Sequence, residues 1–184
     1  MKKRALSAPL KTFCLLLALL LAAAFMPALA PKASAASKKS VTSYQQAVKQ
    51  YYKKYGKESR YRLIDLDGQG SKELICDVPG YYVTLYTKTN GKVHRLMNTW
   101  SYGAGGNGGY FYRPGKNQLG WYVWNDTDHD EFFMKVNAAH TKIITTGSEK
   151  FSTSSGPVFE QKGSGYKRIV GKYKKNQILK QLKK

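Results

Sequence analysis

Oxygen-bearing side chains recur at alternate positions in one short segment of the sequence. They belong to Asp65, Asp67, Gln69, Ser71 and Glu73. Glycines between them let the backbone curl so that the oxygens can converge. A hard cation such as Ca²⁺ needs this arrangement, with roughly six to eight oxygens at about 2.3–2.6 Å. We therefore predict a calcium site at these five residues, with Ser71 contributing its backbone oxygen.

Two departures from an EF-hand loop lower the calcium affinity that we expect of this segment. With Asp65 as position 1, Gln69 stands at position 5, where Asp or Asn is usual. Cys76 stands at position 12, where an EF-hand has a bidentate Glu. Gln69 still offers a neutral carbonyl oxygen, so the expected binding is weak. The alternative is a plain hairpin turn at Asp67-Gly68 with solvated carboxylates.

The stretch from Tyr61 to Ile75 resembles the DxDGDGxxEL segment of FG-GAP and VCBS repeats. It also resembles that of a group of small secreted proteins from Gram-positive gut bacteria. In the repeats this segment is a calcium-binding hairpin of a β-sheet, so the resemblance implies the same ligand role for the five residues above. Gln69 replaces the third Asp of the family. The chain carries one copy, and its length excludes a complete propeller of such repeats.

A second acidic group lies at residues 126–131. It consists of Asp126, Asp128, Asp130 and Glu131 around His129. These residues offer either a second cation site or a carboxylate–histidine pair for acid–base chemistry. An enzyme built on them would be a metal-assisted extracellular hydrolase. The alternative is a charged loop between two strands, and because no nucleophile motif or catalytic metal spacing accompanies the group, we expect a non-catalytic protein.

The first 35 residues have the features of a signal peptide. Residues 2–4 are basic, the stretch from Phe13 to Met26 is apolar, and residues 33–35 form an A-x-A cleavage site. The apolar stretch is shorter than the roughly 20 residues that span a bilayer. We therefore predict that no membrane span remains after cleavage and that the protein is secreted, either extracellular or associated with the cell wall.

The chain beyond residue 35 is strongly basic. Five of the 31 basic residues and none of the 11 acidic ones precede that point, which leaves 149 residues with a net charge of +15. Outside the cell, such a surface attracts anionic wall polymers, anionic lipids, extracellular DNA and acidic glycans. Charge attraction alone retains a protein on them. We predict an anionic cell-envelope polymer or an unidentified protein as partner, and rank nucleic acid lower because of export.

The length after cleavage suits a single domain, which we place at residues 43–184 and expect to be a monomer. Only Cys76 remains, so no internal disulfide is possible. Residues 36–42 are a flexible lead-in. Apolar residues then recur at three- and four-residue steps, which predicts an amphipathic helix over 43–55 that ends at Gly56.

From Arg60 onward β-branched and aromatic residues alternate with polar ones, which is typical of strands. The expected strands are Tyr61–Asp65, Glu73–Val78, Tyr82–Thr87, Lys92–Asn98, Gly109–Arg113, Leu119–Trp124, Glu131–Asn137 and Lys142–Thr146. No crossover helices separate them, so we predict a mainly β (α+β) fold: an antiparallel meander over 60–146, packed by the N-terminal helix. We expect residues 151–184 to form a basic, weakly ordered tail with a short terminal helix at 177–182.

Aromatic residues are dense in and between the expected strands from residue 100 to residue 124. They are Trp100, Tyr102, Tyr110, Phe111, Tyr112, Trp121, Tyr122 and Trp124. Because strand side chains alternate, about half of these rings face away from any single core. An outward set stacks on sugar rings or contacts a partner, unless a second layer covers it. The function that we expect is a secreted binding protein with a basic, aromatic surface. The alternatives are the hydrolase at residues 126–131 or a small secreted inhibitor or effector.

Overall fold

The computed structural model describes residues 41–100, 107–124, 128–152 and 156–183. The expected signal peptide, together with Tyr102 and Asp126, therefore lies outside the described residues. Residues Ser40–Lys184 form one compact unit. It contains all the hydrophobic clusters and hydrogen bonds described below, so we expect it to fold without the residues that precede it. No helix among the described residues is long and apolar enough to cross a membrane.

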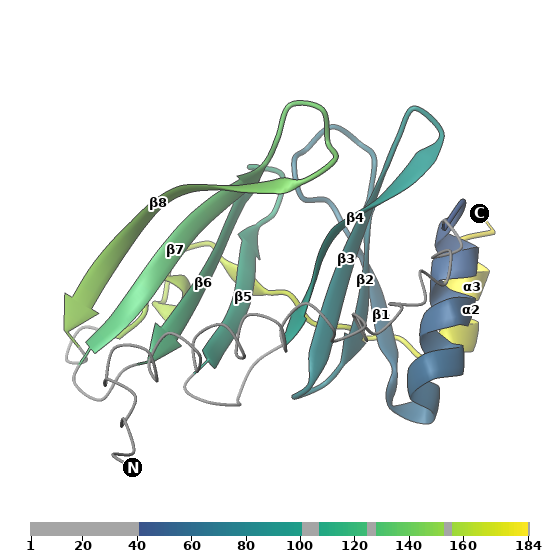
Figure 1. The fold of residues 1–184 in the computed structure, drawn as a ribbon, viewed down its shortest axis with the longest axis horizontal. Coiled ribbons are helices and arrows are strands. Elements are labelled where there is room, and N and C mark those ends of the chain that lie inside the picture. The colour runs from purple at the N-terminus through teal and green to yellow at the C-terminus, as the bar shows by residue number, and fades with distance from the viewer. Residues whose placement is uncertain (1–40, 101–106, 125–127, 153–155, 184) are drawn as a thin grey trace, which may run out of the picture. The chain divides into compact units, whose positions relative to one another are not determined.

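The fold is mainly β and antiparallel, as the sequence predicts, but the strands form two sheets rather than one (Figure 1). The first has the order β1-β2-β3-β4. Its strands are β1 (Arg60–Ile64), β2 (Glu73–Val78), β3 (Tyr82–Thr89) and β4 (Lys92–Trp100). The second has the order β8-β7-β6-β5-β9. Its strands are β5 (Asn107–Arg113), β6 (Gln118–Trp124), β7 (Asp128–Val136), β8 (Ile143–Ser152) and β9 (Lys167–Arg168).

The predicted N-terminal helix is α2 (Tyr44–Tyr55), which covers one face of the first sheet (Figure 1). The Ser43 hydroxyl caps it by accepting the Gln46 N–H at 3.1 Å. Gly56 ends it with a φ of 65°, in the left-handed region that glycine adopts without strain. Ala47, Val48 and Tyr51 are its buried residues. They pack in one cluster with strand residues that include Tyr61, Leu74, Cys76 and Tyr86.

The opposite face of the first sheet contributes to a core that it shares with the second sheet. Alternation along β2 and β3 sends Ile75, Val83 and Leu85 to that side, away from α2. They cluster there with second-sheet residues such as Leu119 and Val136. A third cluster lies on the other face of the second sheet, where the 3₁₀ helix η3 (Val158–Glu160) places Phe159 against Phe111 and Tyr122. Each sheet is therefore packed on both faces.

The C-terminal segment differs from the expected weakly ordered tail. β9 pairs with β5, and Tyr173 then exchanges backbone hydrogen bonds with Tyr61 at 2.8 Å each, so this segment lines an edge of both sheets. Helix α3 (Lys175–Gln181) follows and packs beside α2 (Figure 1). The buried anchors of the C-terminal segment are Ile169, before α3, and Ile178, within it, at 1% and 0% exposure. Sequence reasoning missed them because two isolated isoleucines among lysines and glycines give no periodic signal.

Candidate functional site

The predicted calcium loop connects β1 to β2, and its carboxylates accept hydrogen bonds from the loop itself. Asp65 Oδ1 accepts the Gly68 N–H at 2.7 Å, and Asp67 Oδ1 accepts the Gln69 N–H at 2.9 Å. Glu73 Oε2 accepts the Leu66 N–H at 2.9 Å from across the loop. These bonds hold the backbone in a tight curl. All three acidic residues therefore fix the backbone of this loop.

Glu73 is the most enclosed of these acids. It is 2% exposed, and its Oε1 accepts the Thr87 hydroxyl at 3.2 Å. Burial raises the pKa of its carboxyl to about 7, although the Leu66 N–H opposes that shift. The negative charge of Asp67 raises it further. Glu73 is therefore an acid that holds its proton to near neutral pH and that a nearby cation would favour in its charged form.

The same loop joins the two sheets. The Asp65 and Leu66 carbonyls accept the N–H groups of Gly115 and Asn117, from the β5–β6 turn, at 3.0 and 2.9 Å. Gly68 lies so close to this turn that a Cβ there would meet the Gly115 carbonyl oxygen at 2.9 Å. His140, from the β7–β8 turn, contacts Asp67 Oδ2 through Nδ1 at 3.0 Å. The β1–β2 loop, called the acidic loop below, therefore contacts two other turns, β5–β6 and β7–β8.

The remaining two predicted ligands, Gln69 and Ser71, are exposed. The Ser71 hydroxyl donates to the Lys88 carbonyl at 3.4 Å. Within the described ranges, no three His, Cys, Asp or Glu side chains gather closely enough to hold one ion. Amide and backbone oxygens are calcium ligands as well. Calcium binding at the five residues therefore stays a prediction.

The acidic group at residues 126–131 is not a loop throughout, because Asp128–Glu131 form the first half of β7. His129 and Glu131 point to the same face and lie 2.9 Å apart, from Nε2 to Oε1, with both side chains 0% exposed. Glu131 Oε1 also accepts the Val158 N–H at 2.6 Å. Asp128, on the other face, pairs with Lys150 at 2.8 Å.

Aromatic rings surround the buried His129–Glu131 pair. Phe151 stacks on His129 with ring centroids 5.5 Å apart, and Trp124 lies at 4.9 Å. Glu131 Oε2 and His129 Nδ1 have no hydrogen-bond partner among the described residues. A substrate reaches this pair only if the aromatic packing opens. The geometry therefore gives the hydrolase alternative no accessible catalytic group at His129 or Glu131.

The aromatic residues divide between core and surface, as strand alternation predicts. Phe111, Tyr112 and Tyr122 are each 3% exposed. Tyr110 and Trp121 are half-buried and stack with centroids 5.8 Å apart. Trp100, by contrast, is 49% exposed. Other described residues therefore cover part of this aromatic set, whereas Trp100, at the end of β4, is about half exposed in the described part of the chain.

An aromatic row leads from the end of α2 to the surface. Tyr55 lies 5.6 Å from Tyr82, and Tyr82 stacks on Trp100 at 4.9 Å, centroid to centroid. Tyr81, in the turn before β3, is 61% exposed. Lys54 places its Nζ 4.6 Å from the Tyr55 ring. We call this surface the basic aromatic face and define it by Lys54, Tyr55, Tyr81, Tyr82 and Trp100.

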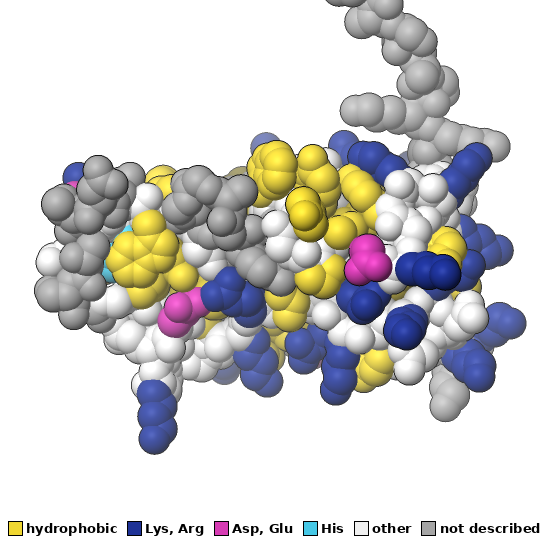
Figure 2. Space-filling view, turned by 90° about the horizontal axis from the view of Figure 1, so that it is seen from below, with side chains coloured by type: hydrophobic (Ala, Val, Ile, Leu, Met, Phe, Trp, Pro, Cys, Tyr) yellow, Lys and Arg dark blue, Asp and Glu magenta, His cyan; other side chains and the backbone are white. Residues whose placement is uncertain are grey.

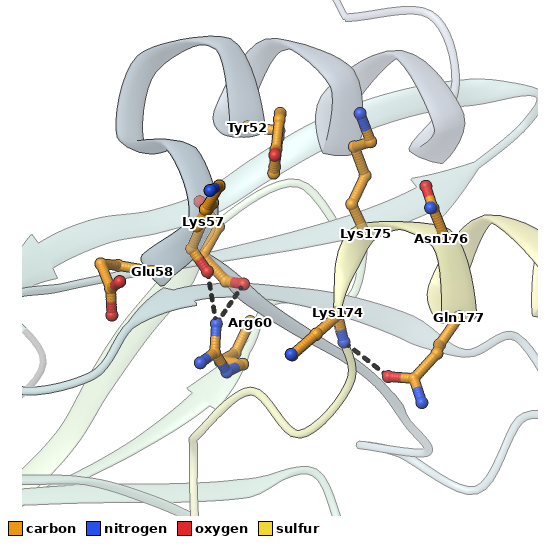
Figure 3. Close-up of a pocket in the computed structure, with 9 residues that line it drawn as sticks. Tyr52, Lys57, Glu58, Arg60, Lys174, Lys175, Asn176 and Gln177 are labelled. Carbon is orange, nitrogen blue, oxygen red and sulfur yellow. Dashed lines mark hydrogen bonds between the residues drawn. The ribbon is translucent and has the colours of Figure 1, made fainter.

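Basic side chains dominate the view of the molecule in Figure 2, where hydrophobic side chains gather between lysines and arginines and far fewer acidic ones are in view. Next to the basic aromatic face, a pocket of about 460 Å³ lies between the end of α2, the start of β1 and α3 (Figure 3). Lys57, Arg60, Lys174 and Lys175 line it. Sequence reasoning missed this pocket because its two halves are more than a hundred residues apart.

Comparison of the chain with models of protein families, with curated proteins and with solved structures finds no match.

Proposed function

We propose that this protein is a secreted, non-catalytic binding protein that an anionic cell-envelope polymer retains through the basic aromatic face. The observation that carries the proposal is the stacked row from Tyr55 through Tyr82 to the exposed Trp100, with Lys54 against the Tyr55 ring and the exposed Lys53 next to it on α2. Rings of this kind lie flat against sugar or polyol units, while the lysines attract the negative groups between them. The net charge of +15 beyond residue 35 acts in the same direction.

A structural calcium ion in the β1–β2 loop is the second part of the proposal. Asp65, Asp67 and Glu73 would supply carboxylate oxygens, Gln69 its amide oxygen and Ser71 its backbone oxygen. The resemblance to calcium-binding repeats and the enclosed Glu73 support this role. The ion would strengthen the loop that joins the two sheets. It would take no part in a reaction.

Retention on isolated cell walls tests the binding proposal. Residues 36–184 are expected to sediment with walls and to stay in solution with the same walls after chemical removal of their anionic polymer. Changing Trp100→Ser and Tyr81→Ser together is expected to weaken retention about tenfold, since each exposed ring contributes on the order of 1 kcal/mol of contact. An unchanged thermal midpoint of the double variant shows that it folds.

Two results would contradict the proposal. Equal retention on walls with and without the anionic polymer would remove the polymer as partner. Tight one-to-one capture of a single wall protein, unaffected by loss of the polymer, would favour the inhibitor or effector alternative instead.

A further inference from the structure

The pocket between α2, β1 and α3 is the strongest candidate for a defined ligand site. Three separate segments line it: the last turn of α2 with η1 (Gly56–Glu58), the start of β1, and the start of α3. Figure 3 shows Lys57 and Arg60 on one side and Lys174 and Lys175 on the other, with Lys174 extending toward Arg60 and Lys175 extending toward Tyr52 on α2. Its volume of about 460 Å³ falls within the usual range of small-molecule sites, roughly 300–1,000 Å³.

The charges in this pocket are unbalanced. None of its four cations forms an ion pair with a residue in the described part of the chain. Glu58 is its one lining acid, and Figure 3 places it away from Lys174 and Lys175. Asp77 lies opposite Arg60 in the β1–β2 ladder, and the Arg60 charge opposes the rise in its pKa, but Asp77 is fully buried and its Oδ2 accepts the Gly171 N–H. The accessible wall of the pocket is therefore positive.

Two of the cations are held in place before any ligand arrives. Arg60 Nη1 donates to the Lys57 and Ser59 carbonyls at 2.7 and 3.0 Å, which leaves other N–H donors of the guanidinium available. Lys175 places its Nζ 4.0 Å from the centre of the Tyr52 ring. Fixed donors lose little entropy when they bind an anion. The pocket is therefore preorganised.

We propose that this pocket binds a phosphate group of a phosphodiester-linked polyol polymer, which deepens the proposed function by naming the charged group that is recognised. A phosphodiester fits better than a carboxylate, because its two charged oxygens and two ester oxygens are arranged tetrahedrally and contact donors from several directions, whereas a carboxylate presents two oxygens in one plane. The volume beyond one phosphate leaves room for the neighbouring polyol unit. Tyr52 at the pocket and Tyr55 in the aromatic row share the last turns of α2, so one polymer strand reaches both.

An NMR titration of residues 36–184 with glycerol 3-phosphate, and with its glycerol diester as the linkage that the polymer contains, at constant ionic strength, tests this site. Amide shifts are expected at residues 57–60 and 174–177 and not at distant lysines. Acetate at the same concentration is expected to bind at least about tenfold more weakly, since it offers fewer acceptor oxygens. Changing Lys57→Gln and Lys174→Gln together is expected to raise the dissociation constant for glycerol 3-phosphate about tenfold.

The matched control is Lys92→Gln with Lys135→Gln, two exposed lysines elsewhere that lower the net charge by the same amount. It is expected to change the dissociation constant less than about twofold. Equal effects of the two double variants, or shifts spread over all lysines, would overturn the pocket and leave only diffuse charge attraction.

The inference and the proposed function fail separately. If walls retain the protein through their polymer while glycerol 3-phosphate gives no localised shifts, the pocket inference is wrong and the function stands. If the pocket titrates while walls do not retain the protein, the function is wrong. An oligonucleotide that binds the pocket more tightly than a polyol phosphate of equal charge would overturn the choice of polymer.

Discussion

Glu73 shows how one buried side chain sets the pH dependence of this fold. Its carboxyl is enclosed by the loop that joins the sheets, and the hydrogen bonds from Leu66 and Thr87 only partly replace water. Burial therefore raises its pKa to about 7. Asp77, buried behind β1, has a pKa raised to about 6 for the same reason. Both acids are more costly to bury when charged.

The free energy of unfolding is expected to fall as pH rises from about 4.5 to about 7. In that range the folded state keeps the Glu73 proton and the unfolded state has lost it, so raising the pH favours unfolding. The fall attributable to Glu73 is on the order of 1–3 kcal/mol. Glu73→Gln is expected to flatten it, as measured by urea unfolding in chelator across this range.

Glu149→Gln, at an exposed position on β8, is the control for that series and should leave the pH dependence as it is in the natural chain. Identical pH dependence in Glu73→Gln and the natural chain would show that Glu73 is not the group that titrates.

Asp67 is the residue at which calcium binding is tested most cleanly. Millimolar Ca²⁺ is expected to raise the thermal midpoint of residues 36–184 relative to chelator. The corresponding gain in the free energy of unfolding is about 2.7 kcal/mol if calcium exceeds its Kd a hundredfold. Asp67→Asn is expected to abolish that rise while its amide oxygen still accepts the Gln69 N–H. A midpoint that ignores calcium in the natural chain would reduce the loop to a hairpin turn.

At the scale of elements, turn residues do more than reverse the chain. Asn117, in the β5–β6 turn, has a φ of 49°, and its amide exchanges two hydrogen bonds with the Val136 backbone at 2.8 and 3.0 Å. Its own N–H donates to Leu66 in the acidic loop. One asparagine thereby connects β6, β7 and the loop that joins the two sheets.

Asn117→Gly is expected to destabilise the fold by about 2 kcal/mol, because glycine keeps the left-handed backbone but loses both side-chain hydrogen bonds. Asn90, in the β3–β4 turn, has the same φ of 49° and is exposed. Asn90→Gly is therefore the matched control and should change stability by less than about 0.5 kcal/mol in chemical unfolding. Equal losses in the two variants would contradict the role of the Asn117 amide.

Elements with a strong local signal were predictable from the sequence, and those that depend on distant contacts were not. The helix at Tyr44–Tyr55 and the turn at Asn90-Gly91 follow from apolar periodicity and from residues that accept positive φ. Strands β7 and β8 extend beyond the expected ends because they pair with each other from Asp128 to Ser152. That pairing stabilises polar positions that give no strand signal by themselves.

The residues of the candidate sites follow the same rule: local geometry was predictable and contacts between distant segments were not. Alternate acidic residues placed the β1–β2 loop correctly, because its geometry is local. The contact of His140 with Asp67 and the burial of Glu131 beneath aromatic rings depend on the arrangement of three turns and two strands. The basic pocket depends on the docking of α3 against α2, which the lysine-rich C-terminal sequence does not specify.

At the scale of the whole molecule, charge and aromatic surface act together in the proposed retention on an envelope polymer. When binding to a polyanion releases counterions, log K falls linearly with the logarithm of the salt concentration. Hydrophobic contact does not weaken in this way. The slope of that plot therefore separates the contribution of the lysines and arginines from that of Tyr81 and Trp100.

Binding of residues 36–184 to a purified polyol-phosphate wall polymer, measured from 50 to 500 mM salt, tests the central claim most directly. The expected result is a straight descending line in the log–log plot, shallower in the Lys57→Gln, Lys174→Gln variant and equally steep but lower in the Trp100→Ser, Tyr81→Ser variant. Binding that does not change with salt, or no binding at 50 mM salt, would contradict the account.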